Sequence, residues 1–183
     1  MTDRPGRIAA LRGRMAASGL DALVVSDLTN IRWLTGFTGS NAVVLVGSEQ
    51  LDLLTDGRYG DQAHRQLAAA AVEASVAVST SSAGLIADLA TACSRTGPVI
   101  GLEADHVTMS VHERWVAATG RRFSPTSGLV EMGRRTKDAT EVSMIEQACR
   151  IADRALAAVT PMLVAGATET GVRNALETRS EEH

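Results

Sequence analysis

The chain has 183 residues, of which 45% are hydrophobic and 21% are charged, an ordinary balance for a folded globular protein. Its formal net charge is −3 and no run of Lys or Arg suggests a basic face, which disfavours nucleic-acid binding. No apolar run is long enough to span a membrane, and residues 1–13 lack the apolar core of a secretory signal. We therefore expect a cytoplasmic protein with no nucleic-acid and no membrane partner.

Apolar spacing, capping residues and glycines divide the first part of the chain into alternating helices and strands. The expected elements are a helix at 3–19, a buried strand at 22–25, a short helical or irregular stretch at 30–34, strands at 42–46 and 51–55, a helix at 58–70, a strand at 72–78, a helix from Ser81 or Ser82, a strand at 99–102, and a helix opened by a Ser110–Glu113 capping box and ended by Gly120. The short connector at 47–50 makes the second and third strands antiparallel neighbours. This order predicts an α/β fold, with a mixed β-sheet flanked by helices on both faces.

The composition changes near residue 130. Residues 131–137 are polar and basic, which indicates a linker or an exposed strand. Asp138 and Glu141 then form a capping pair, and apolar residues at three- and four-residue spacing predict one helix about 34 Å long, at about 1.5 Å per residue. A further helix starts at Thr168. We divide the chain into domains at 1–133 and 134–183, and we expect the second domain to be incomplete.

The loop at 36–40 contains a serine between glycines, but it does not match a catalytic motif. Ser40 lacks the glycines two residues before and two residues after it that a nucleophile elbow requires. Gly36 and Gly39 lack the lysine of a phosphate-binding P-loop. We therefore interpret all three as turn residues.

Potential metal ligands are scattered along the chain. The four histidines do not show the spacing of a metal site, and no carboxylate pair has the histidine and further acids of a two-metal site. These histidines are His64, His106, His112 and His183. Cys93 and Cys149 are isolated within helical patterns, which indicates buried free thiols rather than a disulfide framework or a zinc ribbon.

Asp56, Arg58 and Tyr59 form an unusual cluster that follows a strand and enters a helix. In α/β sheets the carboxyl ends of strands commonly contribute ligand contacts. Two interpretations stay open: Arg58 or Tyr59 contacts a ligand in a pocket, or the cluster only packs and caps the helix.

Two segments together are more specific than any single motif. Residues 28–41 read LTNIRWLTGFTGSN and residues 54–59 read LTDGRY. Together they closely resemble the N-terminal domain of Xaa-Pro aminopeptidases and dipeptidases in the creatinase-like metallopeptidase family. The strand at 100–103 is similar to one late in that domain, and residues 135–141 resemble the junction into the pita-bread catalytic domain.

The resemblance implies a non-catalytic domain that supports dimerisation and helps to enclose the substrate pocket, often that of the neighbouring subunit. In complete family members two divalent ions, Mn, Co or Zn, are held by two Asp, one His and two Glu of the pita-bread domain, beyond its opening helices. None of these ligands is matched by a residue here, and Gly171 departs from the acidic residue usual in that helix. We expect no catalytic residue, metal or cofactor in this chain, which we interpret as truncated early in the catalytic domain. The candidate pocket residues are Asn30, Arg32, Asp56, Arg58 and Tyr59.

The leading hypothesis is the N-terminal, non-catalytic portion of a Xaa-Pro aminopeptidase-like enzyme, forming a homodimer or pairing with a full-length relative. A peptide would bind only in the complete enzyme. The alternative is a stand-alone interaction or regulatory module, suggested by the apolar face of the helix at 138–159. A third hypothesis is an unrelated α/β protein that binds a small ligand.

Overall fold

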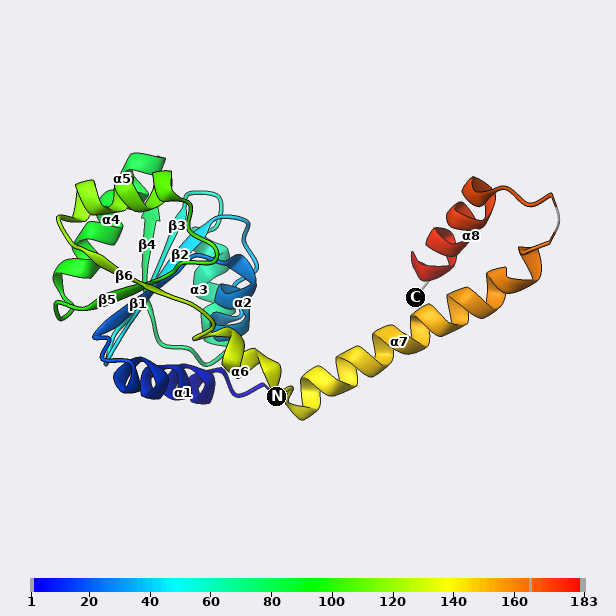
Figure 1. The fold of residues 1–183 in the computed structure, drawn as a ribbon, viewed down its shortest axis with the longest axis horizontal. Coiled ribbons are helices and arrows are strands. Elements are labelled where there is room, and N and C mark those ends of the chain that lie inside the picture. The colour runs from blue at the N-terminus through cyan, green and yellow to red at the C-terminus, as the bar shows by residue number, and fades with distance from the viewer. Residues whose placement is uncertain (1, 165, 182–183) are drawn as a thin grey trace. The chain divides into compact units, whose positions relative to one another are not determined.

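The computed structural model describes residues 2–164 and 166–181, and the chain divides into a unit of residues 3–136 and a unit that includes the residues from Lys137 on. The elements of the first unit are α1 (Arg4–Ala17), β1 (Ala22–Val25), α2 (Leu28–Thr35), β2 (Ala42–Gly47), β3 (Leu51–Asp56), α3 (Gly60–Ala69), β4 (Ser75–Ser79), α4 (Ser82–Ser94), β5 (Ile100–Glu103), α5 (Met109–Thr119), β6 (Phe123–Thr126) and α6 (Glu131–Arg135) (Figure 1). The second unit contains α7 (Ala139–Val159), the 3-10 helix η1 (Thr160–Met162) and α8 (Glu169–Glu181).

The six strands form one mixed sheet in the order β4-β3-β2-β1-β5-β6. β2 is antiparallel to both of its neighbours, β1 and β3, and every other pairing is parallel. Five strands therefore end at the same edge of the sheet, and β2 begins there. We call this edge the carboxyl edge. The predicted hairpin and the predicted mixed sheet are both confirmed.

Helices cover both faces of the sheet because the central strands are apolar on both sides. Along β1, Leu23 and Val25 face a core shared with α1, α2 and α3, whereas Ala22 and Val24 face a core shared with α4 and α5. Figure 1 shows the two groups of helices on opposite sides of the strands. The cores are mainly aliphatic, as a chain with 3% aromatic residues requires.

Local signals explain the ends of α2, which follows the first strand. The side chain of Asp27 accepts a hydrogen bond from the backbone N–H of Thr29, which satisfies one of the free donors at the start of the helix. Gly36 ends the helix with φ +80°, a left-handed conformation that glycine adopts without steric cost. Of the two predicted alternatives for residues 30–34, a helical or an irregular stretch, the structure shows the helix.

One local prediction in the first unit is wrong, and one strand was not predicted. The Ser110–Glu113 capping box does not form, because α5 starts earlier, with Thr108 as its N-cap residue and without a capping bond from the Thr108 side chain. Strand β6 was not predicted, because Pro125 lies within it and proline has no N–H for a ladder. The strand tolerates proline because it is an edge strand that pairs only with β5.

The segment after β6 also differs from the prediction of a linker or an exposed strand at 131–137. Residues 131–135 form the short helix α6, which is preceded by the buried side chain of Val130. Five residues give little helical periodicity, so tertiary contacts rather than local propensity determine this helix.

In the second unit, α7 starts with the predicted capping box. The Asp138 carboxylate accepts a hydrogen bond from the Glu141 backbone at 2.8 Å, and the Glu141 carboxylate accepts one from the Asp138 backbone at 3.0 Å. Much of the apolar stripe of α7 is exposed, including Ile145 at 50% and Leu156 at 55%. Cys149 is exposed as well, so the prediction that both thiols are buried is correct only for Cys93. Among the described residues, no helix has the length and hydrophobicity needed to cross a membrane.

Candidate functional site

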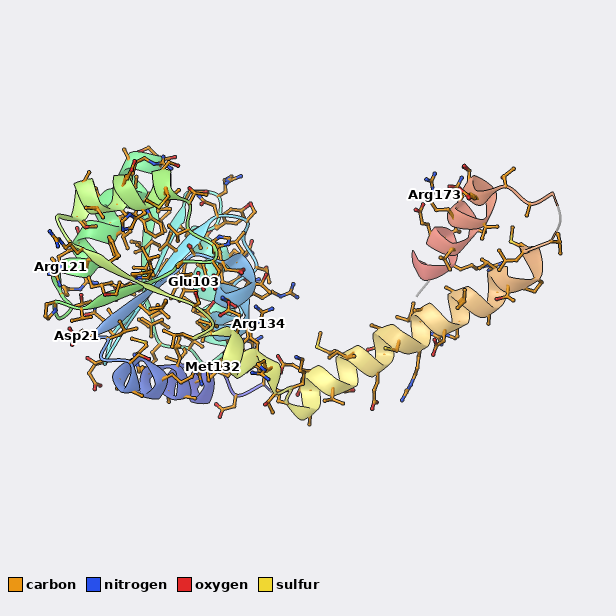
Figure 2. The ribbon with its side chains drawn as sticks, in the orientation of Figure 1. Asp21, Glu103, Arg121, Met132, Arg134 and Arg173 are labelled. Atoms are coloured by element: carbon orange, nitrogen blue, oxygen red, sulfur yellow. The ribbon has the colours of Figure 1, made fainter. Side chains whose placement is uncertain are left out.

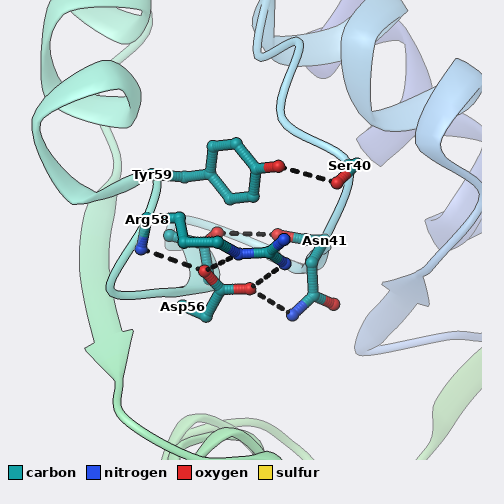
Figure 3. Close-up of polar contacts among 6 residues, drawn as sticks. Ser40, Asn41, Asp56, Arg58 and Tyr59 are labelled. Carbon is teal, nitrogen blue, oxygen red and sulfur yellow. Dashed lines mark hydrogen bonds and ion pairs between the residues drawn. The ribbon is translucent and has the colours of Figure 1, made fainter.

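The carboxyl edge of the sheet carries two separate groups of polar side chains. We call the first the Asp56 cluster; it consists of Ser40, Asn41, Asp56, Arg58 and Tyr59 (Figure 3). We call the second the Asn30 cluster; it consists of Asn30, Glu103, Glu131 and Arg134.

Asp56 is the acceptor that organises the first cluster. Its Oδ1 accepts hydrogen bonds from the backbone N–H and from Nε of Arg58, both at 3.0 Å. Its Oδ2 accepts hydrogen bonds from Nη2 of Arg58 at 2.8 Å and from Nδ2 of Asn41 at 2.7 Å. The carboxylate and guanidinium therefore form a two-point ion pair, the geometry that fixes an arginine most firmly. Asn41 reaches Asp56 because the β2–β3 register pairs Ala42 with Thr55 and so brings the two residues to adjacent strand ends.

The ion pair is held in its charged form. Hydrogen bonds from Arg58 and Asn41 lower the pKa of Asp56 well below its usual range, and the Asp56 carboxylate raises the pKa of Arg58. The Arg58 side chain is nevertheless 67% exposed, so its remaining N–H donors face solvent. Such a fixed and exposed guanidinium suits recognition of a carboxylate or a carbonyl oxygen.

Tyr59 joins this ion pair to the glycine-rich loop. Its hydroxyl group lies 2.7 Å from Oγ of Ser40, and this hydrogen bond lowers the pKa of Tyr59. Its ring packs edge-on against Phe37 at 5.9 Å, and the Arg58 guanidinium lies 5.0 Å from the ring centre. The hydroxyl of Ser40 thus pairs with a tyrosine rather than with a base that would activate it, which agrees with its interpretation as a turn residue.

Asn30 belongs to the second cluster and is completely buried. Its Nδ2 donates to Oε1 of Glu103 at 2.7 Å and to Oε1 of Glu131 at 2.5 Å, while its Oδ1 accepts a hydrogen bond from Arg134 at 2.8 Å. Glu103 is the last residue of β5 and Arg134 lies on α6; both are labelled in Figure 2. This geometry makes Asn30 a link between α2, β5 and α6 rather than a group that is free to bind a ligand.

Glu103 is a buried carboxylate that accepts three hydrogen bonds. Its Oε2 accepts hydrogen bonds from the backbone N–H groups of Ser26 at 2.7 Å and Asp27 at 2.8 Å. Burial raises the pKa of Glu103, the negative charge of Glu131 adds to this increase, and the hydrogen bonds from Asp27, Asn30 and Ser26 oppose it. The carboxylate therefore anchors the turn that follows β1.

A small cavity of about 90 Å³ lies beside Glu103. A volume of this size holds a few water molecules but not a peptide. Asn30 is not among its lining residues, which are Leu23, Asp27, Glu103, Asp105, His106, Thr126, Gly128, Leu129, Val130 and Glu131. The cavity is too small for a peptide, so the Asn30 cluster is not a substrate pocket.

The two clusters are not one site. Asp56 ends β3 and Glu103 ends β5, with β2 and β1 between those strands. Three steps of about 4.8 Å between neighbouring strands separate them by roughly 14 Å. Of the five candidate pocket residues, Asp56, Arg58 and Tyr59 lie together, Asn30 is buried elsewhere, and Arg32 lies exposed on α2. Sequence reasoning missed Asn41, although the predicted hairpin placed it opposite Asp56.

The chain does not provide the ligands of a metal centre in its described part. In residues 2–164 and 166–181, no group of three or more His, Cys, Asp or Glu side chains is arranged to hold a metal ion. The residues therefore do not fit the five-ligand dinuclear centre of complete metallopeptidases, and no step of peptide hydrolysis is assigned to them.

Two comparisons by sequence found similar proteins. The family model described as the creatinase/prolidase N-terminal domain matches residues 7–136. The uncharacterized peptidase YqhT of Bacillus subtilis is 27% identical over 173 residues, which cover 93% of this chain and 47% of that protein.

Comparison with solved structures also found peptidases that this chain resembles. The Xaa-Pro dipeptidase from Bacillus anthracis matches with a TM-score of 0.90 and 28% identity, over 98% of this chain and 49% of that one. The N-terminal domain of the cytoplasmic peptidase PepQ from Mycobacterium tuberculosis H37Rv matches with a TM-score of 0.61 and 33% identity, over 69% of this chain and 97% of that one. The chain thus spans about half the length of the peptidases YqhT and Xaa-Pro dipeptidase.

Proposed function

Because the chain belongs to the creatinase/prolidase N-terminal domain family, we propose that it forms the non-catalytic N-terminal portion of a cytoplasmic Xaa-Pro aminopeptidase-like metallopeptidase. In this role it shapes the substrate pocket and takes part in dimerisation, while a pita-bread domain with two divalent metal ions cleaves the bond before proline. The names of its relatives, a Xaa-Pro dipeptidase and a cytoplasmic peptidase, support this proposal. We also propose that residues 1–133 and 134–183 are separate domains.

The Asp56 cluster is the observation that carries the pocket role. Arg58 is exposed but fixed by a two-point ion pair, so it presents its N–H donors at the carboxyl edge with little conformational freedom to lose on binding. A peptide substrate offers a terminal carboxylate, a group whose geometry matches a guanidinium. We therefore assign contact with the substrate to Arg58 and its support to Asp56.

The first experiment measures hydrolysis of a Xaa-Pro dipeptide by the purified chain in the presence of Mn²⁺ or Co²⁺. We expect no turnover, because the ligand set is not present in the described residues. Metal-dependent turnover that is lost on chelation would refute the non-catalytic assignment.

The pocket role is tested in a chimaera in which residues 1–183 replace the matching half of a Xaa-Pro dipeptidase. Arg58→Ala is expected to raise KM with a smaller effect on kcat, since it removes a binding contact rather than a reacting group. Arg114→Ala is the matched control, because Arg114 is exposed on α5 and is not a candidate pocket residue. Equal KM values for the two variants would contradict the role of Arg58.

The alternative is a stand-alone interaction or regulatory module that pairs with a full-length relative. The exposed apolar residues of α7 favour it, because a stripe of this kind is suited to a protein partner. Light scattering with and without a full-length Xaa-Pro peptidase tests it. A chain that stays monomeric and does not bind the peptidase would exclude this function.

A further inference from the structure

Strand β4 forms one outer edge of the sheet and pairs only with β3. In a parallel ladder, alternate residues turn their backbone groups toward the neighbouring strand. The carbonyl of Ser79 accepts a hydrogen bond from the N–H of Gly57 at 3.1 Å, so Ser75, Ala77 and Ser79 face β3. The backbone N–H and C=O groups of Val76 and Val78 therefore point away from the sheet, and the strand ladder of residues 3–136 leaves them unpaired.

The two edges of the sheet differ in how they are protected. At the opposite edge, β6 contains Pro125, and proline is one of the residues that block the addition of another strand. β4 contains neither proline nor a charged residue, and the side chain of Val78 is 45% exposed. The β4 edge is thus open to pairing with an extended segment.

The sequence of β4 is complementary to itself. Residues 75–79 read SVAVS, which is identical in both directions. If two copies align antiparallel about Ala77, Val76 of each copy lies opposite Val78 of the other, and each such pair exchanges two backbone hydrogen bonds. All of the outward groups of Val76 and Val78 are then satisfied, as a twofold-symmetric interface requires.

We propose that β4 is a self-association surface, which pairs antiparallel with β4 of a second copy and continues the sheet across the twofold axis. This inference rests on the association role proposed above and names its surface. One short strand and its flanks bury less than the roughly 1,200 Å² typical of stable interfaces, so the dimer is weak and depends on concentration.

Sedimentation velocity between about 10 µM and about 1 mM, the range of a weak interface, measures the association. Amide hydrogen exchange at the same concentrations reports on the surface. We expect dimers at the upper end of the range, together with at least about tenfold slower exchange of the Val76 and Val78 amides, whose hydrogen bonds form only in the dimer. Val78→Lys should abolish the dimer, because a lysine on an edge strand prevents pairing. Met109→Lys is the control, since Met109 is 72% exposed on α5.

The possible failures are distinguishable. A dimer in which the Val76 and Val78 amides exchange at monomer rates would overturn the β4 surface but keep the association role. A monomer at every concentration would overturn both. Hydrogen exchange of the unmodified chain does not depend on the folding of any variant, and a urea midpoint near that of the unmodified chain shows that Val78→Lys is folded.

Discussion

Replacing Asn30 with alanine tests whether the Asn30 cluster stabilises the fold. The amide is completely buried and bonds two carboxylates and one guanidinium, which come from β5 and α6. Alanine removes all three hydrogen bonds and leaves the Glu103 carboxylate, which is 8% exposed, with one donor fewer. We therefore expect a large decrease in the free energy of unfolding.

The size of the decrease follows from the burial of each partner. The bond to Glu103 is buried and charge-assisted, so its loss costs about 2 kcal/mol. The bonds to Glu131 and Arg134 are partly buried and contribute roughly 0.5 kcal/mol each after solvent screening. The total of about 3 kcal/mol is a large share of the 5–15 kcal/mol that typically stabilises a domain, so the variant should fold but be clearly weakened.

Urea denaturation followed by tryptophan fluorescence measures this change, because Trp33 and Trp115 both lie in the unit of residues 3–136. With a typical slope of about 2 kcal/mol per M, the midpoint should fall by about 1.5 M. Asn41→Ala is the matched control: its amide donates to Asp56 at an exposed position, so its midpoint should fall by less than about 0.5 M. Equal shifts for the two variants would refute the structural role of Asn30.

Three further predictions follow from other parts of the first and second units. Arg58→Ala should raise the pKa of Asp56 toward the ordinary value, as measured by NMR titration; the small stability that the pair contributes is present above about pH 4 and is lost as pH falls through the lowered pKa of Asp56. A thiol reagent near neutral pH should label Cys149 rapidly and Cys93 slowly, because burial raises the pKa of Cys93 to about 11, and mass spectrometry identifies the site. Leu89→Ala should lower the free energy of unfolding by about 3 kcal/mol, since this core side chain is completely buried; urea denaturation measures the change.

Each of these predictions has a control or a contradicting result. Arg58→Lys, which keeps the charge but loses the two-point geometry, should raise the pKa of Asp56 by less than alanine does. Cys149→Ser should remove the fast labelling, and two equally fast thiols in the folded chain would show that Cys93 is accessible. Leu28→Ala, at a side chain that is 38% exposed, should cost less than Leu89→Ala, and the reverse order would be inconsistent with the described core.

The sequence predicted those features whose signals are local. The apolar run of β1 and the limits of α2 are set by residues within or next to the element, such as Asp27 and Gly36. Only residues 48–50 lie between β2 and β3, a connection short enough to predict their antiparallel pairing. That pairing also determines the contact of Asn41 with Asp56, so part of the Asp56 cluster was predictable.

The features that were missed depend on contacts between distant segments. Asn30 reaches Glu103 across 73 residues and Glu131 across 101, and these contacts exist only because β5 lies beside β1. No spacing within the sequence indicates that neighbour. The helix α6 is too short to have a periodic pattern, and Pro125 obscures β6. Tertiary contacts therefore override weak or contrary local signals at these positions.

The strand order also has a consequence for how the protein is made. From β1 to β4, neighbours in the sheet are neighbours in the chain, so a nascent chain that has reached Ser79 already contains four of the six strands. The remaining two strands start with β5, which pairs with the free side of β1 after Glu103 has been synthesised. Since domains fold from the N-terminus during synthesis, we expect these four strands to assemble on the ribosome while one side of β1 is still unpaired.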